Sequence, residues 1–406
     1  MSKVLDSRRR FLSQCLGAAV SIALPTALGQ ETGVDLGVVR EYPNAILLAV
    51  SPNGELACLY STRHPHETFA WSEGSWKQSK RDSHIADEGL RVVELGSWET
   101  VCAVGLRSSA RHASFFQSGE RIYAETSGFR SGGQLVSQQA VIDTRSGKLA
   151  EHIEVLHPAE RAVYYHAIRD DIVLATVSDG TTRRVETLVR AALPDYREIA
   201  RAPFPVKAPD EPYGRDTEVS ISADRRFVAY GTDHTVVRRR TEDLGITWTR
   251  YVKPGYPFGI FRAAISADGG RVAAAVVDNT FQPKAFYIGV YNGADGAPLA
   301  ELPLNGCDGL AVSPDGALLA VGERVETDPR LQAVELAVSL IDLSSGKRLA
   351  RVVHDQFHIG RGRGRTLWVD SAFGIHGIQF TSDGKYLITS GIKAKVWAIN
   401  RVTRGK

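Results

Sequence analysis

Five charged or imidazole side chains recur at one position relative to glycine turns in the sequence. They stand seven or eight residues before a turn glycine, and the positions that follow them are mostly apolar. The five are Arg111, His112, Arg262, Asp308 and His376. Polar and titratable groups that converge on one place can fix a ligand there. We treat these five as candidate ligand-binding residues; the alternative is that they are solvated polar positions with no ligand.

No other pattern specifies a metal or a catalytic centre. His64 and His66 flank a proline, and His354 and His358 are four residues apart where we expect a loop. A third ligand cannot be assigned to either pair, so we interpret them as solvated surface histidines and expect no metal. The chain contains no Gly-x-Ser-x-Gly sequence, so we expect no catalytic residue and no cofactor. The serines stand mostly at turns, where a hydroxyl bonds local backbone, for example Ser222, Ser313 and Ser382.

Two arginine clusters are the remaining candidates for binding. Residues 360–365 alternate Gly and Arg, which predicts a flexible loop that could grip a carboxylate or phosphate. The alternative is a solvated loop. Arg238–Arg240 form a second run, and Glu242 and Asp243 follow it closely enough to neutralise it across a hairpin.

The elements that position these residues are strands joined by glycine turns, seen most clearly in residues 307–350. Two apolar runs flank the turn Ser313-Pro314-Asp315-Gly316, which predicts a β-hairpin. A polar segment, Glu323–Gln332, follows as an expected loop. Two more strands then surround a second turn at Ser344–Lys347. Four antiparallel strands in one local meander are typical of one blade of a β-propeller.

The same pattern aligns seven times, so the sequence predicts an all-β, seven-bladed β-propeller, with six or eight blades as alternatives. The apolar residues six and four positions before each turn glycine should pack against a neighbouring blade. The candidate ligand-binding residues would then surround the mouth of the central channel. The predicted blades cover approximately 45–106, 112–156, 162–202, 217–253, 261–304, 307–353 and 375–400, the third being the most degenerate.

The seventh repeat ends after its third strand. We expect a strand at about 34–40 to supply the fourth, which would close the ring by pairing the two ends of the chain. The whole of 30–406 would then be one propeller domain.

The turn and strand sequences of this repeat resemble the WD-repeat and YVTN-type bacterial propeller superfamily. The resemblance rests on Ser-Pro-Asp-Gly, Leu-Leu-Ala-Val-Gly and Leu-Ile-Asp-Leu-Ser-Ser-Gly-Lys within residues 313–347 and extends over nearly all of 34–400. The Trp-Asp dipeptide and the Gly-His of eukaryotic WD repeats are missing, so the scaffold roles of that branch are not carried over. The resemblance implies the fold and leaves function open.

Residues 1–29 are typical of a signal peptide, with a basic start, an apolar stretch and small residues at its end. Within them, Ser7, Arg8, Arg9, Phe11 and Leu12 match the twin-arginine export motif position for position. That resemblance implies export of the folded protein to the bacterial periplasm, or to the outside of the cell by the same pathway. A general secretory signal is the alternative. The apolar stretch is too short for a permanent membrane anchor.

Composition narrows the function classes further. The 406 residues are 43% hydrophobic and 23% charged, with a formal charge of +3. The first 29 residues account for that whole charge, so the rest is neutral and offers no general electrostatic ground for binding nucleic acid. Cys58, Cys102 and Cys307 follow the signal. Cys58 and Cys102 could pair, but we interpret all three as small buried apolar residues.

The function that follows is an exported, non-enzymatic propeller that binds a protein partner or a small ligand at its funnel and blade loops. Trp71 and Trp76, in the long insertion Arg63–Gly89, could anchor a protein partner or fold back over their own blade. The alternative is a periplasmic propeller enzyme: a quinoprotein-like dehydrogenase subunit, a lyase or a lactone hydrolase. We expect a monomer.

Overall fold

The computed structural model describes strands, turns and short connections between residues 34 and 401. The described ranges are 34–43, 45–61, 69–72, 75–78, 89–105, 110–126, 129–131, 134–156, 161–178, 185–204, 219–232, 235–252, 258–278, 285–304, 306–328, 333–358, 374–375, 377–391 and 393–401. They contain no helix, and so none that could cross a membrane. The chain divides into two compact units, Met1–Thr32 and Gly33–Lys406, and every described residue belongs to the second. The predicted export motif therefore lies outside the described residues.

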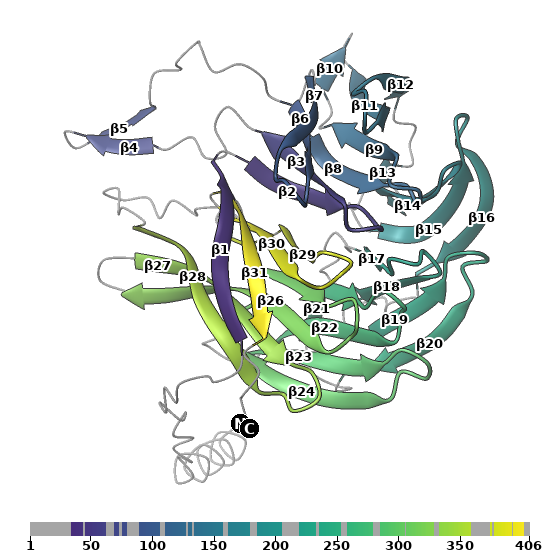
Figure 1. Cartoon of the computed structure of the whole chain (residues 1–406). Coiled ribbons are helices and arrows are strands. Elements are labelled where there is room, and N and C mark those ends of the chain that lie inside the picture. Colours follow the sequence, from purple (N-terminus) through teal and green to yellow (C-terminus); the bar gives the residue numbers. More distant parts are fainter. Residues whose placement is uncertain are drawn as a thin grey trace, which may run out of the picture. The chain divides into compact units, whose positions relative to one another are not determined.

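The described strands form seven antiparallel blades, as the sequence predicts (Figure 1). Blade 1 comprises β2 (Ala45–Val50), β3 (Leu56–Ser61), β6 (Gly89–Glu94) and β7 (Thr100–Gly105). Blade 2 comprises β8 (Ala110–Phe115), β9 (Arg121–Thr126), β11 (Gln134–Asp143) and β12 (Leu149–Leu156), with the short β10 (Phe129–Ser131) paired to β11. Blade 3 comprises β13 (Arg161–Arg169), β14 (Ile172–Ser178), β15 (Val185–Ala192) and β16 (Arg197–Pro203). Blade 4 comprises β17 (Val219–Ile221), β18 (Phe227–Thr232), β19 (Thr235–Arg240) and β20 (Ile246–Tyr251).

The remaining blades repeat this order. Blade 5 comprises β21 (Phe258–Ile265), β22 (Arg271–Asp278), β23 (Ala285–Asn292) and β24 (Pro298–Leu304). Blade 6 comprises β25 (Gly309–Val312), β26 (Leu318–Asp328), β27 (Ala333–Asp342) and β28 (Arg348–His358). Blade 7 comprises β29 (Gly377–Phe380), β30 (Tyr386–Ser390), β31 (Ala394–Arg401) and β1 (Val34–Tyr42). The insertion in blade 1 contributes a separate hairpin of β4 (Phe69–Ser72) and β5 (Ser75–Gln78). The side chains of that hairpin, including Trp71 and Trp76, lie outside the description.

The ring is closed by the pairing of β1 with β31, which confirms the expected closure. The two strands run antiparallel from Val34 opposite Arg401 to Tyr42 opposite Ala394, and they lie side by side in Figure 1. Glu41 of β1 also accepts a hydrogen bond from Lys393, at 2.5 Å. The pairing supplies the fourth strand of blade 7 and joins the two ends of the described chain in one blade.

A hydroxyl and an acid fix the turn between the first two strands of most blades. In blade 6, the Ser313 hydroxyl accepts a hydrogen bond from the backbone nitrogen of Leu318 at 2.8 Å and donates one to Asp315. Gly316 then takes the left-handed conformation, with φ of +68°. Ser222 makes the same bond in blade 4, as expected, whereas blade 7 uses Thr381 and not Ser382. These serines are therefore structural.

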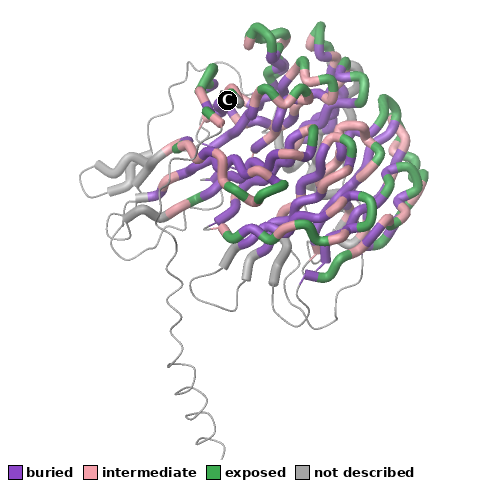
Figure 2. Tube along the Cα trace, turned by 60° about the horizontal axis from the view of Figure 1, so that its bottom comes forward, coloured by how far each residue is buried: buried purple, intermediate pink, exposed green. Residues whose placement is uncertain are grey.

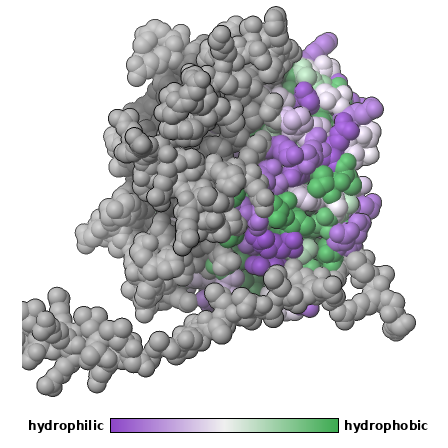
Figure 3. Space-filling view, turned by 90° about the vertical axis from the view of Figure 1, so that its left-hand side faces the viewer, coloured by the Kyte–Doolittle hydropathy of each residue, from purple (hydrophilic) through white to green (hydrophobic). Residues whose placement is uncertain are grey.

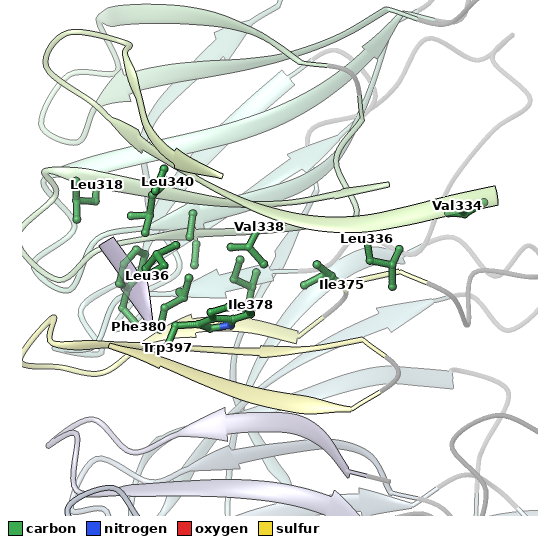
Figure 4. Packing of buried hydrophobic residues seen from close by; sticks show 14 residues of the cluster. Leu36, Leu318, Val334, Leu336, Val338, Leu340, Ile375, Ile378, Phe380 and Trp397 are labelled. Carbon is green, nitrogen blue, oxygen red and sulfur yellow. The ribbon is translucent and has the colours of Figure 1, made fainter. Parts of the chain in front are cut away.

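The hydrophobic core lies between the blades. It consists of seven clusters of buried residues in the described part of the chain, each combining side chains of two adjacent blades. Figure 4 shows the cluster between blades 6 and 7, where Leu340 of β27 and Trp397 of β31 approach from opposite sides with Leu36 of β1. The expected packing of Leu310 and Val312 on a neighbouring blade is confirmed, because both contact blade 5. Seven interfaces for seven blades are what a closed ring requires.

Burial decreases from the strand centres to the turns (Figure 2). The large exposed hydrophobic side chains lie on outer strands and are spread over six blades, for example Val101 of β7, Ile199 of β16 and Tyr251 of β20. On the described part of the face in Figure 3, hydrophobic residues are interspersed with hydrophilic ones. Scattered apolar residues of this kind are ordinary on a protein surface and do not mark a docking site.

Two expectations about blade 6 are wrong. The segment Glu323–Gln332 is not one loop, because β26 continues to Asp328 and pairs with β27. His354 and His358 lie on β28 and not in a loop between blades. The polar composition suggested loops, but the hairpin is extended and Glu323, whose side chain is fully buried, is 3.4 Å from the Arg348 guanidinium.

Candidate functional site

A cavity of about 420 Å³ lies on the propeller axis. The first strands of all seven blades line it: β2, β8, β13, β17, β21, β25 and β29. Each of these strands pairs with only one neighbour, at the end of its sheet. The unpaired edge of each strand therefore faces the channel, where its backbone N–H and C=O groups are available to a ligand.

Arg225 is the residue of the channel with the most unusual conformation. It occupies the turn position at which blades 1, 2, 5, 6 and 7 have a glycine with φ between +68° and +75°, and its own φ is +60°. A left-handed conformation costs a non-glycine residue roughly 1–2 kcal/mol. Arginine stands at this position despite that cost. Contacts of its side chain must therefore offset the backbone strain.

The other three non-glycine residues with positive φ in the described chain are compensated by packing. They are Trp98, Tyr196 and Leu244, each in an outer turn between the third and fourth strands of its blade. Each contacts or belongs to a hydrophobic cluster between blades. Arg225 differs because it lies on the channel and belongs to no such cluster. Its left-handed turn therefore places a guanidinium, and not an apolar group, inside the protein.

The Arg225 guanidinium extends from blade 4 to blade 2. Its Nη2 donates a hydrogen bond to the carbonyl oxygen of Phe115, at 2.8 Å. Its Nε is buried and has no hydrogen-bond partner, and Arg225 forms no ion pair within the part of the chain that the structure describes. Burial lowers the pKa of Arg225 to about 10, so the group remains positively charged at neutral pH. A buried charge without a counter-ion is costly.

Two histidines lie beside this arginine. The rings of His112 in β8 and His166 in β13 meet edge to face, with centroids 4.5 Å apart. Burial lowers the pKa of His112 to about 4. Burial, the neighbouring His112 and the charge of Arg225 together hold the pKa of His166 well below its usual range. Both imidazoles are therefore neutral at neutral pH, and the buried Nε2 of His166 has no hydrogen-bond partner.

The backbone holds the two histidines at this distance. The Ser114 hydroxyl of blade 2 accepts a hydrogen bond from the backbone nitrogen of Ala167 in blade 3, at 3.2 Å. Ser114 lies two residues after His112, and Ala167 directly follows His166. A comparable bond joins blades 7 and 1, where the Gln379 side chain accepts a hydrogen bond from the backbone nitrogen of Val50 at 2.8 Å. These bonds tie neighbouring inner strands together around the channel.

The structure separates the five predicted ligand-binding residues. His112 and Arg262 line the cavity. Asp308 is not among the lining residues, and its carboxylate is 3.8 Å from Arg324. Arg111 lies in β8 with its side chain outside the description, and His376 lies outside the described residues altogether.

Sequence analysis missed His166 and Arg225, for related reasons. The third repeat has no turn glycine, so the register that located the other residues could not be applied to His166. Arg225 was detectable, because Ser222-Ala223-Asp224-Arg225 aligns with Ser266-Ala267-Asp268-Gly269. An arginine at the glycine position of that turn is the signal that could have found it.

The other candidate groups serve the fold. Arg239 donates hydrogen bonds to the Tyr230 hydroxyl and the Pro203 carbonyl, and Arg240 pairs with Asp243 at 2.6 Å. The expectation of a solvated surface histidine is wrong for His354. Its side chain is 2% exposed, because it packs near Trp397 of the next blade. No group of three potential metal ligands occurs among the described residues. Residues 360–365, His64 and His66 lie outside them.

The three cysteines that the structure describes, Cys58, Cys102 and Cys307, are unpaired, and Cys58 and Cys307 are buried. Cys58 and Cys102 both lie opposite Val92, on either side of β6. Two strand spacings amount to about 10 Å, which is too far for a disulfide. Burial raises the pKa of Cys307 to about 12, so this thiol stays protonated.

The comparisons with known proteins agree with the fold. No protein-family model matches this chain, and neither does any curated protein. Among solved structures, the chain is similar to hydrazine synthase of Kuenenia stuttgartiensis, with a TM-score of 0.55 and 11% sequence identity. The match covers 89% of this chain and 96% of that one. At this identity the likeness concerns the β-propeller fold alone.

Proposed function

We propose that the protein is an exported, non-enzymatic β-propeller that binds a small ligand in its central channel. The observation that carries this proposal is the cavity of about 420 Å³, to which all seven blades contribute. Its volume falls within the range of small-molecule sites, and it combines apolar walls with a few convergent polar groups. A protein partner would instead need a broad exposed surface, and the exposed apolar residues of the described outer strands are scattered.

The histidine pair favours binding over proton-transfer catalysis. A general base is most effective when its pKa is near the working pH. The pKa of His112, at about 4, makes its imidazole neutral but weakly basic near neutral pH. Such a ring is suited to hydrogen bonding or packing against a ligand. Enzymatic activity in this channel would therefore depend on groups other than this pair.

The test of the proposal is to block the channel. Ala267 lines the cavity from the turn of blade 5, and Ala267→Trp would place an indole at its mouth. Ala294→Trp makes the same change at an exposed turn of that blade and serves as the control. Binding of a small-molecule library, measured by ligand-detected NMR, should be lost in the Ala267 variant and retained in the control. Equal binding by both folded variants would overturn the proposal.

Native mass spectrometry of protein purified from the periplasm adds a second measurement. We expect a non-covalent ligand that is released on denaturation. Metal analysis and an absorption spectrum of the same sample test the enzyme alternative. A bound metal or quinone in stoichiometric amount would favour the enzyme.

A further inference from the structure

The charges that line the channel are unbalanced. Among the described lining residues there are two arginines, Arg225 and Arg262, and no acidic residue. Arg262 has acidic groups in its neighbourhood. The charges of Arg262, Asp308 and Glu323 all shift the pKa of the Cys307 thiol, so the three groups lie around the same residue. Arg225 forms no ion pair with any described carboxylate, and burial alone accounts for its lowered pKa. The channel therefore contains one positive charge that the described protein does not neutralise.

The geometry of Arg225 indicates how an anion would bind. A guanidinium has five N–H donors in a planar fork that matches a carboxylate. One nitrogen of Arg225 bonds the Phe115 carbonyl, and the buried Nε has no partner. The turn that presents this group is held by Ser222 and Asp224, with Ser222 accepting from Phe227 at 3.0 Å. The side chain is thus fixed in place before a ligand arrives.

The rest of the lining sets the size and the charge of the ligand. Ile221, Ile265, Val312 and Phe380 supply apolar surface along the channel. The two histidines are neutral, so the site as a whole matches one negative charge better than two. An apolar body with a single anionic end would satisfy both features.

We infer that the channel ligand is a small organic monocarboxylate, whose carboxylate binds Arg225 and whose apolar body lies along the inner strands. This inference rests on the proposed function and specifies the ligand class of the same site. The neutral His166, with its unpartnered Nε2, lies beside Arg225 and can add a hydrogen bond to the bound carboxylate.

The test compares hexanoate with its neutral amide, hexanamide, and with inorganic phosphate, by calorimetric titration of the purified protein. We expect hexanoate to bind about tenfold more tightly than the other two, because hexanamide loses the charge-assisted hydrogen bond and phosphate lacks the apolar body. Arg225→Gly should reduce hexanoate affinity to that of the amide and leave amide binding unchanged. The control is Arg226→Gly, which removes the adjacent arginine, paired with Asp224 at 2.7 Å on the surface, and should change neither affinity.

The outcomes separate this inference from the proposed function. If hexanamide binds as well as hexanoate, and Ala267→Trp abolishes both, the channel binds ligands but the carboxylate assignment is wrong. Equal effects of the Arg225 and Arg226 substitutions, tighter binding of phosphate, or no binding of hexanoate would each overturn the inference. If the Arg225→Gly protein does not fold, Arg225→Asn replaces it, since asparagine tolerates the left-handed conformation.

Discussion

Blades 4 and 5 are neighbours with the same strand order and the same two turns, but their turns are built from different residues. Blade 5 has glycine at both left-handed positions, Gly269 and Gly296. Blade 4 has Arg225 at the first and Leu244 at the second. Both residues of blade 4 accept a conformation that glycine adopts without strain. The two side chains must therefore contribute something that offsets this strain.

Leu244 contributes packing. Its side chain is 2% exposed and belongs to the cluster between blades 3 and 4. Arg225 contributes a charge that faces the channel. Blade 5 could not accept a side chain at the first position, because a Cβ on Gly269 would lie 2.6 Å from the Phe227 ring. One turn geometry thus supports the core in one position and a candidate ligand site in another.

The largest effect should come from converting both positions of blade 4 to glycine, one at a time. Leu244→Gly removes a buried leucine and leaves a cavity, so we expect a loss of about 3 kcal/mol even after strain is relieved. Arg225→Gly relieves similar strain and loses one hydrogen bond, so the free energy of unfolding should change by less than about 1 kcal/mol. Urea unfolding measures both. Equal losses would show that Arg225 is also a packing residue.

A smaller effect should appear in acid, at the histidines beside Arg225. The pKa of His112 is about 4 in the folded protein and about 6.5 when unfolded, so only the unfolded state takes up a proton between these values. Stability should therefore fall as the pH is lowered from 6.5 to 4. Since His112 borders the channel, we expect its share to be about 1–2 kcal/mol. His112→Phe should flatten this part of the curve of unfolding free energy against pH; an unchanged slope would contradict the assignment.

The architecture was predictable from sequence because it depends on local rules. A glycine with positive φ, a hydroxyl three residues before it and alternating apolar residues recur often enough to count blades and to pair β1 with β31. Blade 3 was found by its apolar strands, although its turn of Arg169, Asp170 and Asp171 has no glycine. The turn glycine also fixed the register, so His166 was lost where the glycine was missing.

The candidate site was harder to predict because it depends on distance across the channel. Nothing local indicates that the Arg225 side chain reaches Phe115, 110 residues earlier in the chain. The extension of blade 6 was missed for a similar reason. Glu323 and Glu335 have polar side chains typical of a loop, but Arg351 of the adjacent β28 lies 2.6 Å from Glu335 and 3.9 Å from Glu323. Such ion pairs are visible only after the strands are paired.

The smallest effect should distinguish the acid of the blade 5 turn from the arginine of the blade 4 turn. A hydrogen bond from the backbone nitrogen of Gly270, with another from Ser266, lowers the pKa of Asp268. Asp268→Asn should cost about 0.5–1 kcal/mol at neutral pH by weakening these bonds. Because the folded pKa is depressed, that cost should persist above about pH 4 and shrink as the pH falls through the folded value.

Hexanoate affinity should not change, since the turn of blade 5 presents no charge to the channel. Unfolding curves at neutral and acidic pH, with one titration of hexanoate, measure both; a loss of affinity equal to that of Arg225→Gly would mean that turn geometry, and not the guanidinium, determines binding.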